Sequence, residues 1–287
     1  MFTTQPRLLI RFRHHRVRIP GMLVRSGDAD IFYEVQGDGA PVVLLHPFPI
    51  HHGFWHYVSE ILSPQYKLIL PDLRGMGVST AGDGPATMQK HADDLKRVCD
   101  DARIGKCVFV GVSIGGYLLF EFWRRHRERA IGLAFCNTRA NAETEEGKKG
   151  RYEAAQKIEE RGTEQFIDGL LPRLIGETTR RNRPDLVDEA RTMVLKTTAK
   201  GMIANQLGMA ERPDSLPALA TITVPTLFVG GTEDLGAPPP EIERMHAGVR
   251  GSRMRIIPNA GHYAAMERPQ EFAEILREFL RGVQHTG

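Results

Sequence analysis

Short apolar runs recur along the chain, and longer stretches with a helical spacing of apolar residues lie between them. The runs are apolar on both faces, which is typical of buried parallel strands. They are Val42–Leu45, Leu68–Leu70, Val108–Val110, Leu133–Phe135, Thr226–Val229 and Met254–Ile257. The amphipathic stretches of helical length are Trp55–Leu62, Met88–Ala102, Tyr117–Arg125, Pro240–Ala247 and Pro269–Leu280. This alternation predicts an α/β fold in which a mostly parallel sheet carries helices on both faces.

One block interrupts the alternation. Residues 141–213 are charged, helical in their apolar spacing and poor in β-branched runs. The expected helices of this block are Lys148–Glu160, Gln165–Leu171, Leu186–Lys196 and Gly201–Ala210. We interpret the block as an α-helical lid inserted into one α/β core, which residues 22–140 and 214–287 form. The core is expected to begin with a β-hairpin of Val24–Arg25 and Ile31–Glu34.

Composition excludes some classes of protein and places the positive charge. The chain has 287 residues, of which 41% are hydrophobic and 25% charged, so it is globular rather than wholly disordered. Residues 1–21 contain five arginines and no acidic residue, and subtracting these five charges from the net +3 leaves −2 for the rest. We expect residues 1–21 to be a disordered extension, with a start at Met22 or a transit-peptide-like arm as alternatives. A nucleic-acid-binding arm is disfavoured because no nucleic-acid-binding module follows it.

The sequence shows no signal for a membrane or a metal. No apolar stretch reaches the length of a membrane span, and no secretory signal is present. The three cysteines lack CxxC spacing, which indicates neither a disulfide framework nor a zinc site and favours a cytoplasmic setting. The cluster of His51, His52 and His56 is expected to serve a helix start and the surface rather than a metal.

The central chemical signal is the G-x-S-x-G motif around Ser113. The motif spans Gly111–Gly115 and directly follows the apolar run Val108–Val110. A serine at a sharp strand-to-helix turn is a nucleophile elbow, and small flanking residues relieve the crowding there. The alternative is a glycine-rich turn with no catalytic task. Position between a buried strand and a helix favours Ser113 as a nucleophile.

A nucleophilic serine needs a base and an orienting acid, which follow it along the chain in this type of site. Asp234 lies in the loop after Thr226–Val229, and His262 lies in the loop after Met254–Ile257. Both loops are at carboxyl ends of predicted parallel strands, where open α/β sheets place their sites. We predict Asp234 as the acid and His262 as the base, with Glu233 as the competing acid.

The oxyanion of an acyl-transfer reaction needs two backbone N–H donors. Ile114, directly after the serine, supplies one of them. The second is expected from the loop after Val42–Leu45, which reads His46-Pro47-Phe48-Pro49. Because prolines carry no N–H, Phe48 is the predicted donor within this turn.

From Met22 to Val283 the chain resembles the α/β-hydrolase-fold serine hydrolases. Besides the predicted triad, Asp72–Ser79 resembles the D-x-R-G-x-G-x-S loop of that family. Within the fold the sequence is similar to the 3-oxoadipate enol-lactonase group, through His46–Pro49, Cys136–Ala140 and Gln206–Ala210. The family usually has His-Gly before the oxyanion residue, and here Pro47 replaces the glycine. Epoxide hydrolases and dehalogenases of this fold carry an aspartate nucleophile, so Ser113 argues against both.

The resemblance implies a cofactor-free serine hydrolase of a small carboxylic ester or lactone. Trp55 and Arg139 are candidate substrate contacts, and Arg139 is placed to pair with a substrate carboxylate, with a structural salt bridge as its alternative. Three other functions share the triad: a carbon–carbon bond hydrolase, a cofactor-free perhydrolase and a hydrolase-like receptor for a small ligand. No metal, nucleic acid or membrane partner is expected.

Overall fold

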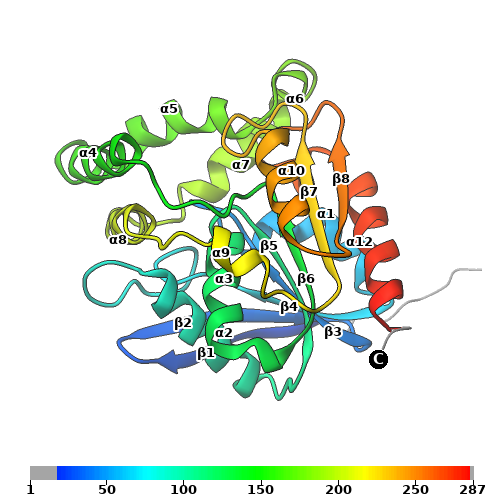
Figure 1. Cartoon of the computed structure of the whole chain (residues 1–287). Coiled ribbons are helices and arrows are strands. Elements are labelled where there is room, and N and C mark those ends of the chain that lie inside the picture. Colours follow the sequence, from blue (N-terminus) through cyan, green and yellow to red (C-terminus); the bar gives the residue numbers. More distant parts are fainter. Residues whose placement is uncertain (1–17, 285–287) are drawn as a thin grey trace, which may run out of the picture.

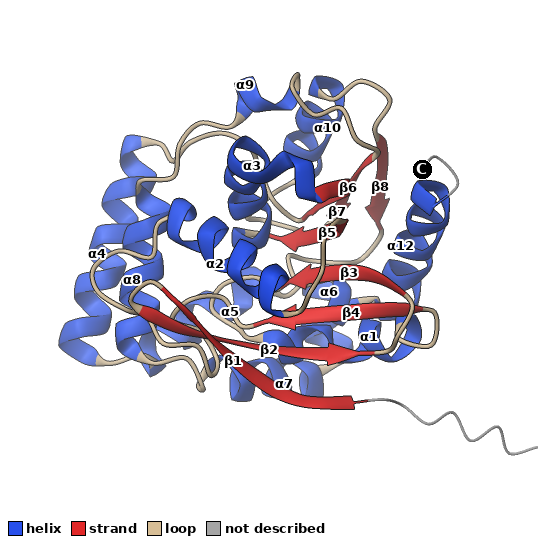
Figure 2. Ribbon diagram, turned by 90° about the horizontal axis from the view of Figure 1, so that it is seen from below, coloured by secondary structure: helices blue, strands red, loops and turns tan. Residues whose placement is uncertain are grey.

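The computed structural model describes residues 18–284, which form one eight-stranded sheet flanked by helices (Figures 1 and 2). The strands are β1 (Arg18–Ser26), β2 (Ala29–Gln36), β3 (Ala40–Leu45), β4 (Tyr66–Pro71), β5 (Cys107–Val112), β6 (Ala130–Cys136), β7 (Thr226–Gly231) and β8 (Arg253–Ile257). Their order in the sheet is β1-β2-β4-β3-β5-β6-β7-β8. Neighbours from β4 to β8 are parallel, whereas β2 is antiparallel to both β1 and β4. The predicted α/β fold with a mostly parallel sheet is confirmed.

The helices of the core cover both faces of the sheet (Figure 2). They are α1 (His56–Leu62), α2 (Met88–Asp101), α3 (Ile114–His126), α10 (Pro239–Gly248), α11 (Ala264–Glu267) and α12 (Pro269–Gln284), with a short α9 (Leu216–Leu219) before β7. Two 3₁₀ turns, η1 (His52–Trp55) and η2 (Arg127–Arg129), precede α1 and β6. Helix α2 packs on α3, and α1 packs on α12. None of the helices in residues 18–284 combines the length and apolarity needed to cross a bilayer.

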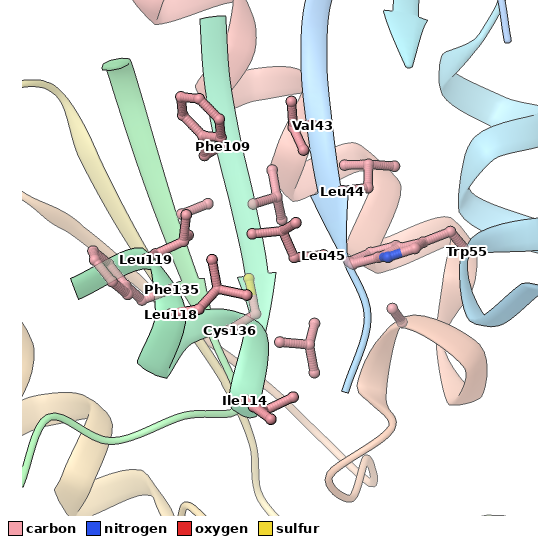
Figure 3. Close-up of a cluster of buried hydrophobic side chains, with 14 of the residues drawn as sticks. Val43, Leu44, Leu45, Trp55, Phe109, Ile114, Leu118, Leu119, Phe135 and Cys136 are labelled. Carbon is pink, nitrogen blue, oxygen red and sulfur yellow. The ribbon is translucent and has the colours of Figure 1, made fainter. Parts of the chain in front are cut away.

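The core lies between the central strands and these helices. Figure 3 shows Val43 and Leu44 of β3, Phe109 of β5 and Phe135 of β6 among its buried side chains. These side chains are fully buried, which explains why their strands appear as uninterrupted apolar runs. Burial of this apolar surface fixes the strands, and therefore the positions of the loops at their carboxyl ends.

A helical insertion joins β6 to β7 and lies beyond the carboxyl ends of the strands (Figure 1). It consists of α4 (Glu145–Arg161), α5 (Glu164–Leu174), α6 (Glu177–Asn182), α7 (Pro184–Val194) and α8 (Ala199–Ala210). The sequence pattern predicts four helices here and misses α6. The reason is that α6 is one and a half turns of polar residues, with no apolar repeat to mark it.

The N-terminal boundary at residue 21 needs a correction. The expected extension covers residues 1–21, but strand β1 begins at Arg18, and Arg18 and Ile19 pair with Gln36 and Val35 of β2. The pairing register shifts between Ile19 and Met22, across Pro20 and Gly21. Proline and glycine argue against a strand in a sequence pattern, and here they occupy an irregularity within one. The remainder of the predicted extension, residues 1–17, lies outside the described residues.

Candidate active site

Ser113 occupies the turn between β5 and α3 with a backbone that side-chain-bearing residues rarely adopt. Its φ is 55° and its ψ is −114°. A Cβ added to Gly111 would lie 2.4 Å from the carbonyl oxygen of Gly115, and one added to Gly115 would lie 2.8 Å from that of Leu45. The two glycines of the motif are therefore required by close backbone approach. The strained turn raises Ser113 above the core and turns it toward the helical insertion.

Hydrogen bonds on both sides hold the serine turn in place. The N–H of Ser113 donates to the carbonyl of Cys136 at 3.0 Å. The Ser113 carbonyl accepts from the Thr138 hydroxyl at 2.8 Å and from the N–H of Gly116 at 2.8 Å. Strand β6 and the residues that follow it thus hold the backbone of the serine turn through hydrogen bonds.

Asp234 and His262 form a buried pair at the ends of β7 and β8. The Nδ1 atom of His262 lies 2.9 Å from both carboxylate oxygens of Asp234. The Oδ1 atom of Asp234 also accepts the N–H groups of Gly236 and Ala237, at 2.8 and 2.9 Å. Burial alone raises the pKa of Asp234, but the charge of His262 and these hydrogen bonds outweigh it and bring the pKa to about 2. Asp234 is therefore an anion that faces the imidazole.

Glu233 faces the other way. Its carboxylate accepts the backbone N–H of Thr178 at 2.8 Å and also the Thr178 hydroxyl, so it holds the first turn of α6. Of the two neighbouring acids, the structure therefore brings Asp234 to His262 and Glu233 to the helical insertion.

Ser113 and His262 line one cavity of about 690 Å³. No hydrogen bond within residues 18–284 joins the Ser113 hydroxyl to the imidazole. Such bonds are often long before substrate binds and tighten in the complex. The cavity extends from Ser113 and His262 to helices α4, α5 and α8, which supply much of its wall.

The loop after β3 brings Phe48 to the same cavity. His46 anchors this loop, because its Nδ1 lies 2.9 Å from the Pro47 carbonyl and its Nε2 accepts the N–H of Leu73 at 2.9 Å. Burial lowers the pKa of His46 to about 4, so the ring is neutral. The hydroxyl of Tyr263 donates to the Phe48 carbonyl at 3.3 Å. These contacts fix the orientation of the Phe48 peptide.

Neither predicted oxyanion donor has a hydrogen-bond partner among the described residues. No hydrogen bond of the described residues takes the N–H of Phe48. Ile114 is the first residue of α3, where an N–H has no partner within the helix. The structure thus places Phe48 at the cavity and Ile114 directly after Ser113.

The histidines after this loop hold it to the rest of the core. His51 caps η1 by accepting the N–H of Gly53. His52 lies 2.7 Å from Asp72 and 3.5 Å from Glu34. Burial lowers the pKa of His52, but hydrogen bonds to these two carboxylates outweigh it and raise the pKa to about 9. A ligand atom of each of His51, His52 and Asp72 lies within 4.8 Å of the others. Nδ1 of His51 accepts the N–H of Gly53 and His52 is bonded to Asp72, whereas Nε2 of His51 is buried with no partner among the described residues.

The prediction that Trp55 contacts substrate is wrong. Trp55 is fully buried and packs against Phe54 and Phe272, with ring centroids 5.0 and 6.0 Å apart. It is absent from the cavity wall, and Figure 3 shows it in the core beside Leu45. Trp55 is the last residue of η1 and directly precedes α1, and its side chain fills the core against Phe272 of α12.

Arg139 does line the cavity. Its guanidinium lies 3.3 Å from Glu143, and its Nε has no hydrogen-bond partner among the described residues. Sequence reasoning does not name the rest of the wall, which is mainly contributed by the insertion. Its members include Tyr117, Arg151, Phe166, Leu170, Arg173 and Gln206, and also Leu235, which directly follows Asp234 in the acid loop. Apart from Gln206, which begins the stretch similar to the enol-lactonases, no short motif marks these residues, because their common cavity arises only when helices far apart in the chain pack together.

Comparison with known proteins gives concordant results. Residues 42–275 match a family described as the alpha/beta hydrolase family. The chain is 25% identical to 3-oxoadipate enol-lactonase 1 of Acinetobacter baylyi over 248 residues, which cover 86% of this chain and 91% of the relative. It is 39% identical to a thermophilic esterase from Thermogutta terrifontis solved with malate bound, with a TM-score of 0.88 over 93% and 98% of the two chains. The enol-lactonase of Burkholderia xenovorans is 25% identical, with a TM-score of 0.85 over 91% and 100%.

Proposed function

The chain belongs to the alpha/beta hydrolase family, and from this premise we propose that it is a serine hydrolase that cleaves a small carboxylic ester or lactone. The observation that carries the proposal is the buried Asp234–His262 pair in a cavity that also exposes Ser113 at a strained turn. Similarity to esterases and enol-lactonases supports carboxylic ester or lactone chemistry. The proposed reaction needs no cofactor.

In the proposed mechanism Ser113 attacks the acyl carbon. His262 accepts the serine proton and then delivers it to the leaving oxygen, while Asp234 holds the ring and stabilises the imidazolium. The N–H groups of Phe48 and Ile114 bind the oxyanion of each tetrahedral intermediate. Water, activated by the same histidine, then hydrolyses the acyl-enzyme and releases the acid.

The position of the helical insertion supports its role as a lid over this site. Residues from α4, α5 and α8 line the cavity together with Ser113, so the insertion shapes the space that the acyl and leaving groups occupy. Phe166 and Leu170 of α5 make part of that wall apolar. We assign residues 141–213 to this lid.

The position of Arg139 supports the proposal that the substrate carries a carboxylate. It lines the cavity with an unpartnered buried Nε, and Glu143 offsets only part of the local positive charge, because it also pairs with Arg151 and Arg212. A guanidinium binds a carboxylate well through paired N–H groups. The related esterase was solved with malate, a dicarboxylate, bound to it. The proposed substrate is therefore an ester or lactone that carries a carboxylate.

The test is replacement of Ser113. Ser113→Ala should lower hydrolysis of p-nitrophenyl acetate by about 10³-fold or more and should abolish labelling by a fluorophosphonate probe. Ser63→Ala, at the end of α1 and outside the cavity, is the matched control and should leave both unchanged. Undiminished hydrolysis in Ser113→Ala would overturn the proposal.

The choice among substrates needs a screen of esters, lactones and carbon–carbon ring-cleavage products, with a peracid assay alongside. Multiple turnovers on an ester or lactone are expected. Single-turnover labelling without steady-state cycling would instead indicate a receptor, and activity confined to carbon–carbon substrates or peracid formation would indicate those reactions.

A further inference from the structure

Asn137 connects the acid and base loops through one side-chain amide. It follows Cys136 at the end of β6 and is fully buried. Its Nδ2 donates to Oδ2 of Asp234 at 2.9 Å and to the carbonyl oxygen of Gly261 at 3.1 Å. Gly261 directly precedes His262. One nitrogen atom therefore contacts both the acid and the peptide that carries the base.

The chemistry of the two partners fixes the orientation of the amide. A carboxylate and a carbonyl oxygen both accept hydrogen bonds only, so the NH₂ group must face them, and its two protons match the two acceptors. The Oδ1 atom of Asn137 is left buried with no partner among the described residues. An unpaired buried carbonyl destabilises the fold. The side chain therefore holds Asp234 and Gly261 at the cost of a hydrogen bond to its own Oδ1.

The backbone at Asn137 is adapted to this contact. Its φ is 45°, in the left-handed region that asparagine tolerates better than other side-chain-bearing residues. Its N–H donates to the carbonyl of Val229 in β7 at 2.8 Å, so the residue is anchored to the strand that leads into Asp234. The side chain therefore projects from a fixed point between the two loops.

The base loop is also held by other contacts, among them the N–H of Glu233 donating to the Ala260 carbonyl at 2.8 Å and the N–H of Asn259 donating to the Thr232 hydroxyl at 2.9 Å. Glu267 accepts the N–H of Gly261 at 3.0 Å, while Asn137 takes the carbonyl of the same residue. On the acid side, the N–H groups of Gly236 and Ala237 hold Oδ1 of Asp234. Apart from His262, Asn137 is the one residue of the described chain whose side chain donates to Oδ2.

We propose that Asn137 is a positioning residue for the Asp234–His262 pair. Its amide holds the carboxylate in line with Nδ1 of His262 and fixes the distance between the acid and base loops. This inference rests on the proposed function, because it assigns Asn137 a part in the same hydrolysis. Alanine at this position offers no donor, and aspartate offers a second carboxylate to Asp234, so neither replaces the asparagine.

The kinetic test compares Asn137→Ala with Asn141→Ala. Asn141 lies in the same segment and its amide contacts only the carbonyl of Ala142 among the described residues, so it is the matched control. Asn137→Ala should lower kcat on p-nitrophenyl acetate by about 10- to 100-fold while KM changes by less than about 2-fold, because misalignment of catalytic groups acts on the chemical step. Asn141→Ala should keep both constants.

A spectroscopic readout separates positioning from catalysis. The Nδ1 proton of a histidine bonded to a carboxylate gives an isolated low-field proton resonance. In a Ser113→Ala background this resonance should be sharp, and adding Asn137→Ala should shift or broaden it, whereas adding Asn141→Ala should not. If Ser113→Ala alone kept full activity, the proposed function would fail while this readout would still test Asn137.

Stability controls complete the experiment. If Asn137→Ala does not fold, Asn137→Asp keeps the shape of the side chain and removes both N–H donors. It should lower kcat further than alanine, because two carboxylates then face each other. The inference is overturned if a folded Asn137 variant keeps kcat within about twofold of the parent and leaves the low-field resonance unchanged.

Discussion

Glu233 and Asp234 are neighbours in the chain, yet their surroundings assign them different tasks. Asp234 is buried and accepts hydrogen bonds from His262, Asn137 and two backbone N–H groups. Glu233 is half-buried and bonds Thr178 at the start of α6. The sequence alone does not decide which of the two acids pairs with His262, because neighbouring loop residues point in different directions that only the folded backbone defines.

Separate alanine variants test this assignment. Asp234→Ala should lower kcat by about 10³- to 10⁴-fold, since the imidazole loses the group that fixes its tautomer. Glu233→Ala should keep kcat within several-fold and instead weaken the attachment of α6. Steady-state hydrolysis of p-nitrophenyl acetate, with circular dichroism to check folding, measures both. Greater loss in Glu233→Ala than in Asp234→Ala would show that the acid is misassigned.

Arg139 is testable through the charge of the substrate. Arg139→Gln should raise KM for the mono-p-nitrophenyl ester of succinic acid by about 10-fold or more, because a charge-assisted contact of about 1.5–3 kcal/mol is lost. Neutral p-nitrophenyl acetate should be affected far less. Arg250→Gln removes an equal charge from an exposed site outside the cavity and is the control. Equal effects on both esters would assign Arg139 to structure alone.

At the scale of secondary-structure elements, Glu143 ties the two ends of the helical insertion together. It precedes α4 and pairs with Arg151 of α4 at 2.5 Å and with Arg212, just after α8, at 2.6 Å. Arg212 is itself buried, and its guanidinium lies 4.5 Å from the centre of the Tyr117 ring. Burial raises the pKa of Glu143, but the two arginines outweigh this and bring it to about 2. Glu143 is therefore charged at neutral pH.

Glu143→Gln should lower the free energy of unfolding by about 3 kcal/mol, because it leaves Arg212 buried without its counter-charge. Urea denaturation measures the loss. Glu145→Gln is the control, since the Glu145 side chain is 93% exposed and its pair with Lys148 spans 3.5 Å. Equal stability of the two variants would contradict the inference that Glu143 stabilises the insertion by pairing with Arg151 and Arg212.

The sequence predicts most secondary-structure elements of the core but not all of their bounds. Strand–helix alternation predicts the sheet and the helices of the core, and it places Ser113, Asp234 and His262 in loops that the structure brings to one region. It misses α6, whose short polar segment has no periodicity, and it begins β1 too late because Pro20 and Gly21 disguise a strand. Trp55 is misassigned because an aromatic residue near a catalytic loop looks the same in sequence whether it faces the cavity or the core.

For the whole molecule, parallel strand direction explains why distant residues converge. The carboxyl ends of the parallel strands meet at one edge of the sheet. Each residue of the proposed site follows one of these strands: Phe48 follows β3, Ser113 follows β5, Asn137 follows β6, Asp234 follows β7 and His262 follows β8. Any member of the fold shares this edge. The insertion between β6 and β7 supplies much of the cavity wall, so we expect substrate preference to follow the insertion rather than the sheet.

The titration of buried histidines gives a whole-molecule prediction for stability. Burial lowers the pKa of His46, His51 and His91 from the ordinary 6.5 to about 4, so the folded protein keeps them neutral where the unfolded chain is protonated. Stability therefore rises as pH increases from 4 to 6.5, by up to about 3 kcal/mol for each fully buried ring. His52 acts in the opposite sense, because its pKa is raised to about 9 by the pairs with Asp72 and Glu34. Its contribution is complete below pH 6.5 and is lost as pH rises to 9.

The free energy of unfolding should therefore peak near pH 6.5 and fall on both sides, more steeply toward acid, where three histidines act together. Urea denaturation from pH 4.5 to 9 measures the curve. His52→Gln should flatten the alkaline limb, because no imidazolium remains to be discharged, and should preserve the acid limb. His91→Gln should reduce the acid slope and leave the alkaline limb intact. If His52→Gln instead retains the full alkaline decline, another group titrates there, and the ion pair of His52 with Asp72 and Glu34 does not control stability above neutrality.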